Sequence, residues 1–242
     1  VYAFCRIADD LADAPGLDDD RRRRELDLLS RTLRTKRYTE DDMLWPAFFD
    51  TIERRGIPLH YFDEILKGVM SDIDPHTPKN IQELEHYSYL VAGVVGIVCV
   101  YILSSVSPSK SVLEGAKRLG IAMQITNIMR DVSADLAINR IYLPLSLLKK
   151  HGLSMDDIKN TTYDERFVAL MAELATLANN HYAAARDTIA LLEPSAKRPV
   201  IIMLRLYQSI LERIEQKRYN VYNTRIRLGA LSKLGVVISA RP

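Results

Sequence analysis

The stretch Gln124-Ile125-Thr126-Asn127-Ile128-Met129-Arg130-Asp131-Val132-Ser133-Ala134-Asp135 carries the most informative pattern of the chain. Asn127, Asp131 and Asp135 follow one another at steps of four residues, and each step advances roughly 40° around an α-helix. Their three oxygen-bearing side chains therefore line one stripe of a helix. The isoleucines and the methionine between them are apolar, so we expect the stripe to line a cavity rather than to face bulk water.

A second acidic row lies near the start of the chain, in Asp9-Asp10-Leu11-Ala12-Asp13. Asp9 and Asp13 are four residues apart, so their side chains project from one helix face about one turn from each other. Like charges at this spacing repel, and a cation between the carboxylates compensates for the repulsion. Alone, such a pair is weak evidence, because acidic pairs occur on many exposed helices.

Two acidic rows on two apolar helices from distant parts of the chain can face each other across a cavity. They offer oxygen ligands without a cluster of His or Cys, and this donor set selects Mg²⁺ rather than Zn²⁺. Magnesium held by one or two carboxylates from each side completes its shell with water and with substrate phosphates. The sequence therefore predicts a diphosphate ligand.

Basic and hydroxyl groups lie where a departing diphosphate needs them. Arg6 stands three residues before the first acidic row, Arg130 lies within the second, and Arg140 and Tyr142 follow just beyond it. Guanidinium groups bind phosphate oxygens in a bidentate manner and stabilise the negative charge of a leaving group. For any one of these arginines, an exposed ion pair with a nearby aspartate is an equally good interpretation.

The composition is that of a globular protein with a sizeable core. The 242 residues are 48% hydrophobic and 26% charged, which excludes a disordered or fibrous chain. A net charge of +2 argues against a nucleic-acid-binding protein with a basic field. Two cysteines, Cys5 and Cys99, do not make a disulfide framework, and with no signal peptide at the start we expect an intracellular protein.

Apolar residues recur at spacings of three and four almost throughout, which predicts an all-α protein. No long linker or solenoid repeat interrupts the pattern, so we expect one helical domain over residues 1–242, with a central cavity. Because apolar residues already recur at helical spacing in the first residues, with no helix-start signal before them, we expect the numbered chain to begin inside a helix. The expected helices span residues 1–13, 18–37, 44–55, 58–70, 80–104, 109–136, 163–192 and 198–221.

Three local features allow two interpretations each. The apolar run Leu90–Val106 is about 17 residues long, short for a membrane span, which favours a buried core helix. Within it, Ala92 and Gly96 leave a groove for a neighbouring helix or for an apolar ligand, and helix packing is favoured. The run Arg21–Arg24 could bind phosphate, but a solvated helix face beside acidic residues is the better interpretation.

With these segments together, the sequence resembles the squalene and phytoene synthase family, and its phytoene synthase branch most of all. The resemblance rests on Tyr-Ala-Phe-Cys-Arg-x-x-Asp-Asp-x-x-Asp at 2–13, Tyr-x-x-x-Val-Ala-Gly-x-Val-Gly at 87–96 and Gln-x-Thr-Asn-Ile-x-Arg-Asp-Val-x-x-Asp at 124–135. Arg-Ile-Tyr-Leu-Pro at 140–144 completes it, and the match runs over essentially the whole chain.

The resemblance implies an isoprenoid synthase-type helical bundle that joins two prenyl diphosphates head to head through a cyclopropylcarbinyl diphosphate. It implies two geranylgeranyl diphosphates as substrates, phytoene as the product, and two or three Mg²⁺ per site, with Mn²⁺ as a substitute. The implied metal ligands are Asp9, Asp13, Asp131 and Asp135, supported by Asp10 and Asn127. The implied diphosphate-binding residues are Arg6, Arg130, Arg140, Tyr142 and Arg225. Tyr2, Tyr87 and Tyr207 are implied to line the reaction zone, and Val91, Ala92, Gly96 and Gln124 to border the prenyl tails.

The chain departs from the family pattern in three places. Ala134 stands where the family usually has an acidic residue, and Asn139-Arg140 stands where it often has Gly-Arg. The family's first helix, with its Ser-rich and basic diphosphate contacts, has no counterpart before Val1. We therefore expect little or no synthase activity if this is the whole polypeptide. If it is a fragment, we expect the activity in the longer polypeptide from which it comes.

Several alternatives stay open at this point. A squalene or dehydrosqualene synthase uses farnesyl diphosphate, and only squalene formation needs NADPH. A class I terpene cyclase, a non-catalytic assembly factor of the same fold and a helical membrane-surface binder are further alternatives. We expect a cytoplasmic protein or one peripheral on a membrane, in a plastid if the source is a plant or an alga. The oligomeric state stays open.

Overall fold

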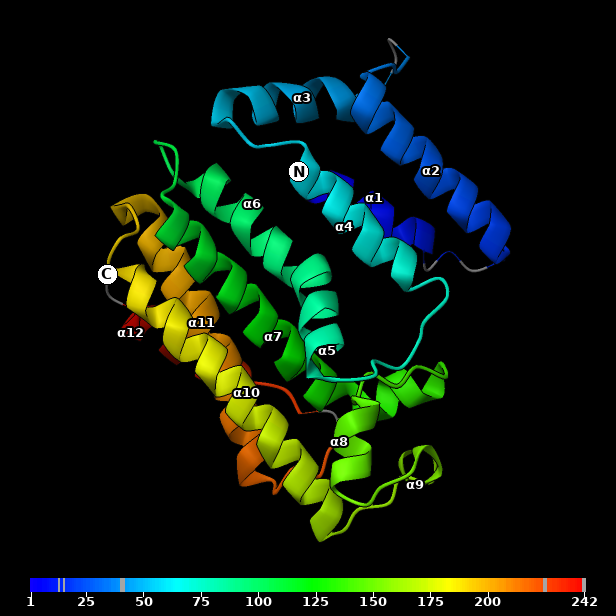
Figure 1. The fold of residues 1–242 in the computed structure, drawn as a ribbon. Coiled ribbons are helices and arrows are strands. Elements are labelled where there is room, and N and C mark those ends of the chain that lie inside the picture. Colours follow the sequence, from blue (N-terminus) through cyan, green and yellow to red (C-terminus); the bar gives the residue numbers. More distant parts are fainter. Residues whose placement is uncertain (13, 15, 40–41, 224–225, 241–242) are drawn as a thin grey trace. The chain divides into compact units, whose positions relative to one another are not determined.

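A computed structural model of the chain divides into two compact units (Figure 1). The first unit comprises residues 1–75 and 105–107, and the second comprises residues 76–104 and 108–242. The structure describes residues 1–12, 14, 16–39, 42–223 and 226–240. Every regular element within these ranges is helical, which confirms the all-α prediction. That the two units form one domain stays a prediction.

The first unit consists of four helices around an aromatic core. Phe4 stacks on Phe48 with a ring-centroid distance of 4.8 Å and meets Phe62 edge-on at 5.4 Å. Phe4, Ala8 and Ala12 recur every four residues and are all buried, so one stripe of the first helix faces this core. The helices are α1 (Tyr2–Ala12), α2 (Asp19–Thr35), α3 (Leu44–Arg55) and α4 (His60–Ser71).

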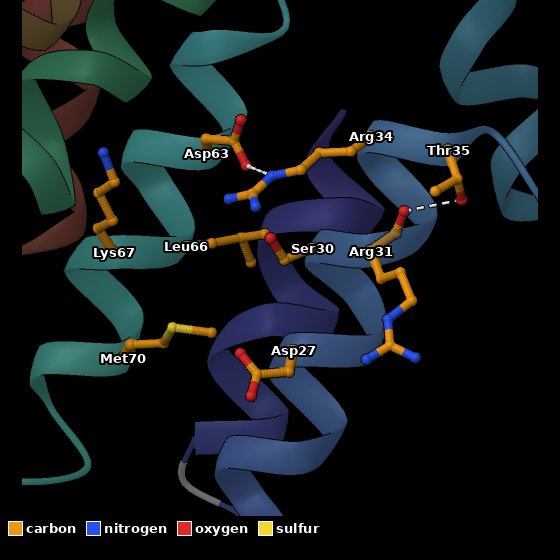
Figure 2. A pocket seen from close by; sticks show the side chains of 9 residues that line it. All are labelled: Asp27, Ser30, Arg31, Arg34, Thr35, Asp63, Leu66, Lys67 and Met70. Carbon is orange, nitrogen blue, oxygen red and sulfur yellow. Dashed lines mark hydrogen bonds and ion pairs between the residues drawn. The ribbon is translucent and has the colours of Figure 1, made fainter.

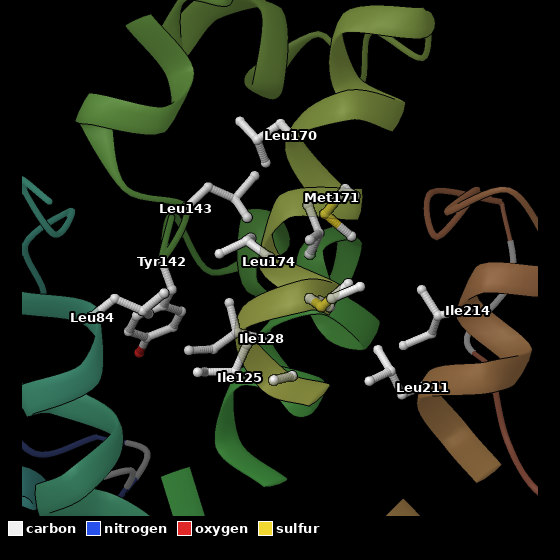
Figure 3. Packing of buried hydrophobic residues seen from close by; sticks show 14 of the residues in the cluster. Leu84, Ile125, Ile128, Tyr142, Leu143, Leu170, Met171, Leu174, Leu211 and Ile214 are labelled. Atoms are coloured by element: carbon white, nitrogen blue, oxygen red, sulfur yellow. The ribbon is translucent and has the colours of Figure 1, made fainter. Parts of the chain in front are cut away.

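The second unit is built around two long helices, α7 (Lys110–Ala137) and α10 (Glu165–Ile189). Figure 3 shows their apolar side chains interlocking, with Ile125 and Ile128 from α7 and Leu174 from α10. The other elements of this unit are α5 (Ile81–Ser88), the π-helix η1 (Tyr89–Gly93), α6 (Val94–Leu103), α8 (Leu145–Lys150), α9 (Met155–Lys159), α11 (Pro194–Gln216) and α12 (Ala230–Ser239).

The observed helices differ from the expected ones mainly at their ends. The helix expected at 198–221 begins four residues earlier, at Pro194, because proline is tolerated at the first helical position, where its missing N–H has no intrahelical partner. The helices α8 and α9 were not predicted, since six and five residues are too few for a helical period to stand out. The C-terminal helix α12 was also missed.

By length and composition alone, the continuous helix Ile81–Leu103 is apolar enough to cross a membrane. The mean hydropathy of its most apolar window is 1.8, and 33% of that window is buried inside the structure. Val94, Ile97 and Val98 are among its buried residues. Its close packing against α7 is the arrangement expected of a core helix, and core helices and membrane spans can share this composition.

One buried histidine joins three helices of the second unit. His181 on α10 is 3% exposed, and its Nε2 lies 2.7 Å from Oε1 of Glu85 on α5. Its Nδ1 lies 3.5 Å from Nη1 of Arg118 on α7, and Arg118 also pairs with Glu114. Burial lowers the pKa of His181 below its ordinary value of 6.5, although Glu85 acts in the opposite direction.

Acid is therefore expected to destabilise the protein through His181. Because its pKa is lower in the folded state, the unfolded chain binds more protons once the pH falls below about 6.5, and stability is lost as the pH falls further through the folded-state pKa. The drop in Tm between pH 7.5 and pH 5.5 should be smaller in a His181→Gln variant than in the wild type. An equal drop in both proteins would contradict this role for His181.

Candidate functional site

An apolar cavity of about 460 Å³ lies entirely within the second unit. Its walls come from η1, α6, α7, α10 and α11. The four residues that the family resemblance implied as borders of the prenyl tails all line this cavity. The predicted residues along its walls are Val91, Ala92, Gly96, Gln124, Asn127 and Tyr207.

Close contact between α6 and α7 explains Gly96, the second glycine of the Val-Ala-Gly-x-Val-Gly motif. A Cβ atom on Gly96 would lie 2.6 Å from the Ala116 carbonyl oxygen, and one on Gly120 would lie 2.3 Å from the Ala92 carbonyl oxygen. Only glycine permits such an approach of two backbones. The prediction that the Ala92/Gly96 groove serves helix packing is confirmed, and the same two residues also border the cavity.

A π-helical turn, η1, interrupts the α-helical pattern at the cavity wall. Val91 and Ala92 lie within this wider turn, and both line the cavity. Such single π-turns are found frequently at functional sites. The apolar periodicity of the sequence predicted one continuous helix here and did not indicate the wider turn.

Polar groups gather at one end of the otherwise apolar cavity, from Gln124 and Asn127 on α7 and Tyr207 on α11. The Asn127 side chain donates a hydrogen bond from Nδ2 to Oε1 of Gln124 over 3.4 Å. The Asn127 Oδ1 atom is buried and has no hydrogen-bond partner. A buried acceptor without a partner is unfavourable, so this oxygen is suited to a cation or to a donor from a ligand.

The next turn of α7 carries a bidentate ion pair. Arg130 donates from Nε to Oδ1 of Asp131 over 3.0 Å and from Nη2 to Oδ2 over 2.5 Å. Both side chains are about 15% exposed. Hydrogen bonding to Asp131 raises the pKa of Arg130, with a further contribution from the charge of Asp135. The guanidinium is therefore held charged and oriented beside the predicted metal-binding carboxylates.

Tyr87, implied to line the reaction zone, stacks on Tyr142, implied to bind diphosphate, with ring centroids 4.9 Å apart. Tyr142 follows α7 in a segment that is tied to the start of α5, because the Leu145 N–H donates to the Pro78 carbonyl oxygen over 2.9 Å. A small pocket nearby is lined by Asp135, Arg140 and Tyr142.

Asn139, which replaces the family's glycine, has a φ of 57°. Asparagine is one of the few non-glycine residues that adopt this left-handed conformation readily. In this turn the Arg140 N–H donates to the Asp135 carbonyl oxygen over 2.8 Å, which places Arg140 near Asp135. Asparagine in place of the family's glycine is therefore compatible with the turn.

The first acidic row belongs to the first unit. On α1 the buried stripe turns Arg6, Asp9 and Asp10 to the exposed side, and Arg6 pairs with Asp10 over 2.8 Å. This pair between exposed side chains is the alternative interpretation given above for Arg6, an ion pair with a nearby aspartate. Tyr2, at the start of the same helix, is 81% exposed.

The structure does not test whether the two acidic rows face each other. Asp13 and Arg225 lie outside the described residues. Within the described ranges, no three His, Cys, Asp or Glu side chains gather as a metal site. Each row is placed within its own unit, so the shared metal site stays a prediction.

A second hollow, of about 340 Å³, lies between α2 and α4 of the first unit (Figure 2). Its lining mixes acidic and basic side chains, and Arg34 donates from Nε to Oδ1 of Asp63 over 3.0 Å. None of the site residues expected from the sequence lines it. At the start of α2, Arg22 and Arg23 pair with Asp19 and Asp20, as expected of a solvated helix face.

The sequence reasoning missed part of the cavity wall. Cys99 and Leu103 continue the three-and-four spacing that begins at Ala92 and Gly96, so that spacing could have identified them. Apart from Tyr207, which the family resemblance implied, no sequence signal identified the contributions of α10 and α11, because contacts between distant helices leave no local period. The missed residues there include Thr188, Leu192, Val200 and Met203.

The chain is similar to proteins of one known family. Residues 1–232 match the family model described as Squalene/phytoene synthase. The phytoene synthase of Arthrospira platensis is 32% identical over 97% of this chain and 79% of its own length. Phytoene synthase 1, chloroplastic, of Zea mays is 34% identical over 97% of this chain, which spans 58% of that protein.

Solved structures of related enzymes superpose on the chain. A dehydrosqualene synthase in complex with ligand has a TM-score of 0.87 and 28% identity, covering 99% of this chain and 83% of its own. Squalene synthase HpnC from Alicyclobacillus acidocaldarius has a TM-score of 0.83 and 26% identity. This match covers 90% of this chain and 82% of the HpnC chain. The match to the family model over nearly the whole chain and the identities above 30% show that this chain belongs to the squalene/phytoene synthase family.

Proposed function

We propose that this protein joins two molecules of geranylgeranyl diphosphate head to head to form phytoene. The family consists of prenyltransferase-type enzymes that use prenyl diphosphates and generally depend on divalent metal ions. The observation that carries the proposal is the apolar cavity of about 460 Å³ with Gln124, Asn127 and Tyr207 at one end. This arrangement suits a ligand with a long hydrocarbon tail and an anionic head.

The donor set of the second acidic row suits magnesium. Carboxylate and amide oxygens are its preferred ligands, and the buried Asn127 Oδ1 has no competing hydrogen bond. In this proposal Asp131 and Asp135, together with Asp9 and Asp13 and supported by Asp10 and Asn127, hold the metal. When bound, Mg²⁺ neutralises the diphosphate charge and so assists its departure.

The arginines bind the diphosphate oxygens in this proposal. Arg130 presents a charged, oriented guanidinium one turn beyond Asn127, and Arg140 lies near Asp135. Arg6 and Arg225 contribute in the same way. Preorganised positive charge of this kind stabilises a leaving group more than flexible solvent does.

Two ionisations complete the proposed reaction. Loss of diphosphate from one substrate leaves an allylic cation, and the double bond of the other substrate captures it to form a cyclopropylcarbinyl diphosphate after loss of a proton. Loss of the second diphosphate drives the rearrangement, and loss of another proton gives phytoene. In this proposal Tyr2, Tyr87 and Tyr207 line the reaction zone and Tyr142 contacts the diphosphate. The apolar walls keep out water that would quench the cations.

The direct test supplies the purified protein with Mg²⁺ and either geranylgeranyl or farnesyl diphosphate, each with and without NADPH. We expect a symmetric C40 hydrocarbon from geranylgeranyl diphosphate without NADPH, lost on chelation of the metal and restored by Mg²⁺ or Mn²⁺. A cyclised product from one substrate, or no consumption of either substrate, would contradict the proposal. No consumption would favour the assembly-factor alternative.

A second candidate is the squalene or dehydrosqualene synthase reaction, which the two superposed structures favour. In that case farnesyl diphosphate gives the doubled C30 product, and only squalene formation requires NADPH. Plant relatives such as the Zea mays protein are named chloroplastic, so a plastid is the corresponding location for a plant or algal source. Vesicle flotation tests peripheral membrane association.

A further inference from the structure

One end of the apolar cavity is closed by side chains from two helices and from the turn that follows α10. Val100 and Leu103 on α6, Val112 on α7 and Leu192 after α10 lie in one apolar cluster. The Ser195 hydroxyl donates to the Leu103 carbonyl oxygen over 3.0 Å and ties the start of α11 to the end of α6. The cavity is thus closed at this end and polar at the other.

The contacts between α6 and α7 allow distances along the cavity to be estimated. Gly120 meets Ala92, and four residues further Gly96 meets Ala116, so α6 and α7 run antiparallel in a constant register. Continued by another four residues, this register pairs Val100 with Val112, and these two residues belong to the same cluster. Depth in the cavity can therefore be measured along α7.

From Asn127 to Val112 is fifteen residues along α7, which at 1.5 Å per residue is about 22 Å. From Asn127 to Ala116 is eleven residues, or about 16 Å. An isoprene unit contains four main-chain carbon–carbon bonds and spans about 5 Å when extended, since a chain of such bonds advances about 1.2 Å per bond. A tail that starts beside Asn127 and runs along α7 would therefore end near Ala116 if it is C15 and near Val112 if it is C20.

We propose that the closed end of this cavity selects prenyl chain length in this protein. The residues that act on the fourth isoprene unit are Cys99, Leu103, Val112 and Leu192, which we call the terminal pocket. This inference rests on the proposed function and adds the residues that distinguish C20 from C15 substrates. A tail that fills the terminal pocket removes apolar surface from water, whereas a C15 tail leaves it empty.

Cys99 is the best position at which to test the proposal. Its side chain lines the cavity and is nevertheless exposed, so a larger residue can be accommodated without overpacking a filled core. Cys99→Phe places a ring in the terminal pocket. We expect kcat/KM for geranylgeranyl diphosphate to fall about tenfold or more, while kcat/KM for farnesyl diphosphate stays within about twofold.

A control is Ile102→Phe, which places the same aromatic ring three residues along α6 at a position outside the cavity lining. Both kcat/KM values should stay close to those of the wild type in this variant. Equal kcat/KM ratios for C20 and C15 in Cys99→Phe, Ile102→Phe and the wild type would overturn the proposal. If the wild type consumes neither substrate, the proposed function itself has failed.

Alkylation of Cys99 in the wild type gives a second readout that does not depend on activity. The apolar cavity wall around Cys99 desolvates its thiol and raises the pKa of that thiol. Labelling with N-ethylmaleimide is therefore carried out at alkaline pH and followed on the peptide that contains Cys99. Non-hydrolysable thiolo-diphosphate analogues of both lengths serve as ligands. We expect the C20 analogue to slow labelling at least about fivefold more than the C15 analogue does; equal protection by both would overturn the proposal, even if Cys99→Phe fails to fold.

Discussion

Replacing Asp131 by asparagine is expected to lower kcat on prenyl diphosphates about a hundredfold to a thousandfold, the range found when one preorganised electrostatic group is removed from an active site. The substitution keeps the shape of the side chain but removes the negative charge. Both Asp131 oxygens accept hydrogen bonds from Arg130, and asparagine keeps only one of these acceptors. The variant therefore loses a proposed metal ligand and also loosens the oriented guanidinium. Steady-state kinetics at saturating Mg²⁺ measures the effect.

The same variant needs a control for stability, because removal of one partner leaves the largely buried Arg130 charge unpaired. Its Tm and circular dichroism should therefore be measured with kcat. The matched variant Asp156→Asn removes an equal charge from an exposed position on α9 and should leave kcat unchanged. A folded Asp131→Asn protein with kcat within tenfold of the wild type would contradict the role proposed for Asp131.

The second large effect is expected from Gly120→Ala. The added Cβ would lie 2.3 Å from the Ala92 carbonyl oxygen, 2.6 Å from its carbonyl carbon and 2.7 Å from the Gly93 Cα. All three are backbone atoms, so a side-chain rotation cannot relieve the clash, and α7 must separate from η1. We expect the free energy of unfolding to fall by about 1–3 kcal/mol or more, measured by urea denaturation.

Activity should fall as well, because Gly120 and Ala92 both line the cavity. The matched control is Gly235→Ala on α12, where nothing lies within 4 Å of an added Cβ. That substitution should be neutral or stabilising by about 0.5–1 kcal/mol, since alanine is the better helix former. If Gly120→Ala unfolds at the same urea concentration as the wild type, the close approach of α7 to η1 is not required for stability.

Much of the site could be predicted because its residues repeat at the period of one helix. The spacing of Asn127, Asp131 and Asp135 placed them on one stripe of α7, and the polar end of the cavity begins on that stripe. The all-α class followed from the same apolar period along the chain. The boundaries of α3 were predicted to the residue, at 44 and 55.

Other features could not be predicted, because they depend on contacts between segments that are far apart in the chain. The cavity is closed by Val100, Val112 and Leu192, and no local pattern relates these three positions. The π-turn at Tyr89–Gly93 changes the register of one helix without a change in its apolar composition.

Local periodicity in the chain was sufficient to assign the fold class and the two acidic rows, since each depends on residues within a few helical turns. The resemblance of four sequence motifs to those of a known family indicated the family. The depth of the cavity and the residues that end it depend on how closely α6 and α7 approach and on where the end of α10 meets them. Packing between distant helices sets these distances, and a single sequence contains no record of them that can be recognised from spacing alone.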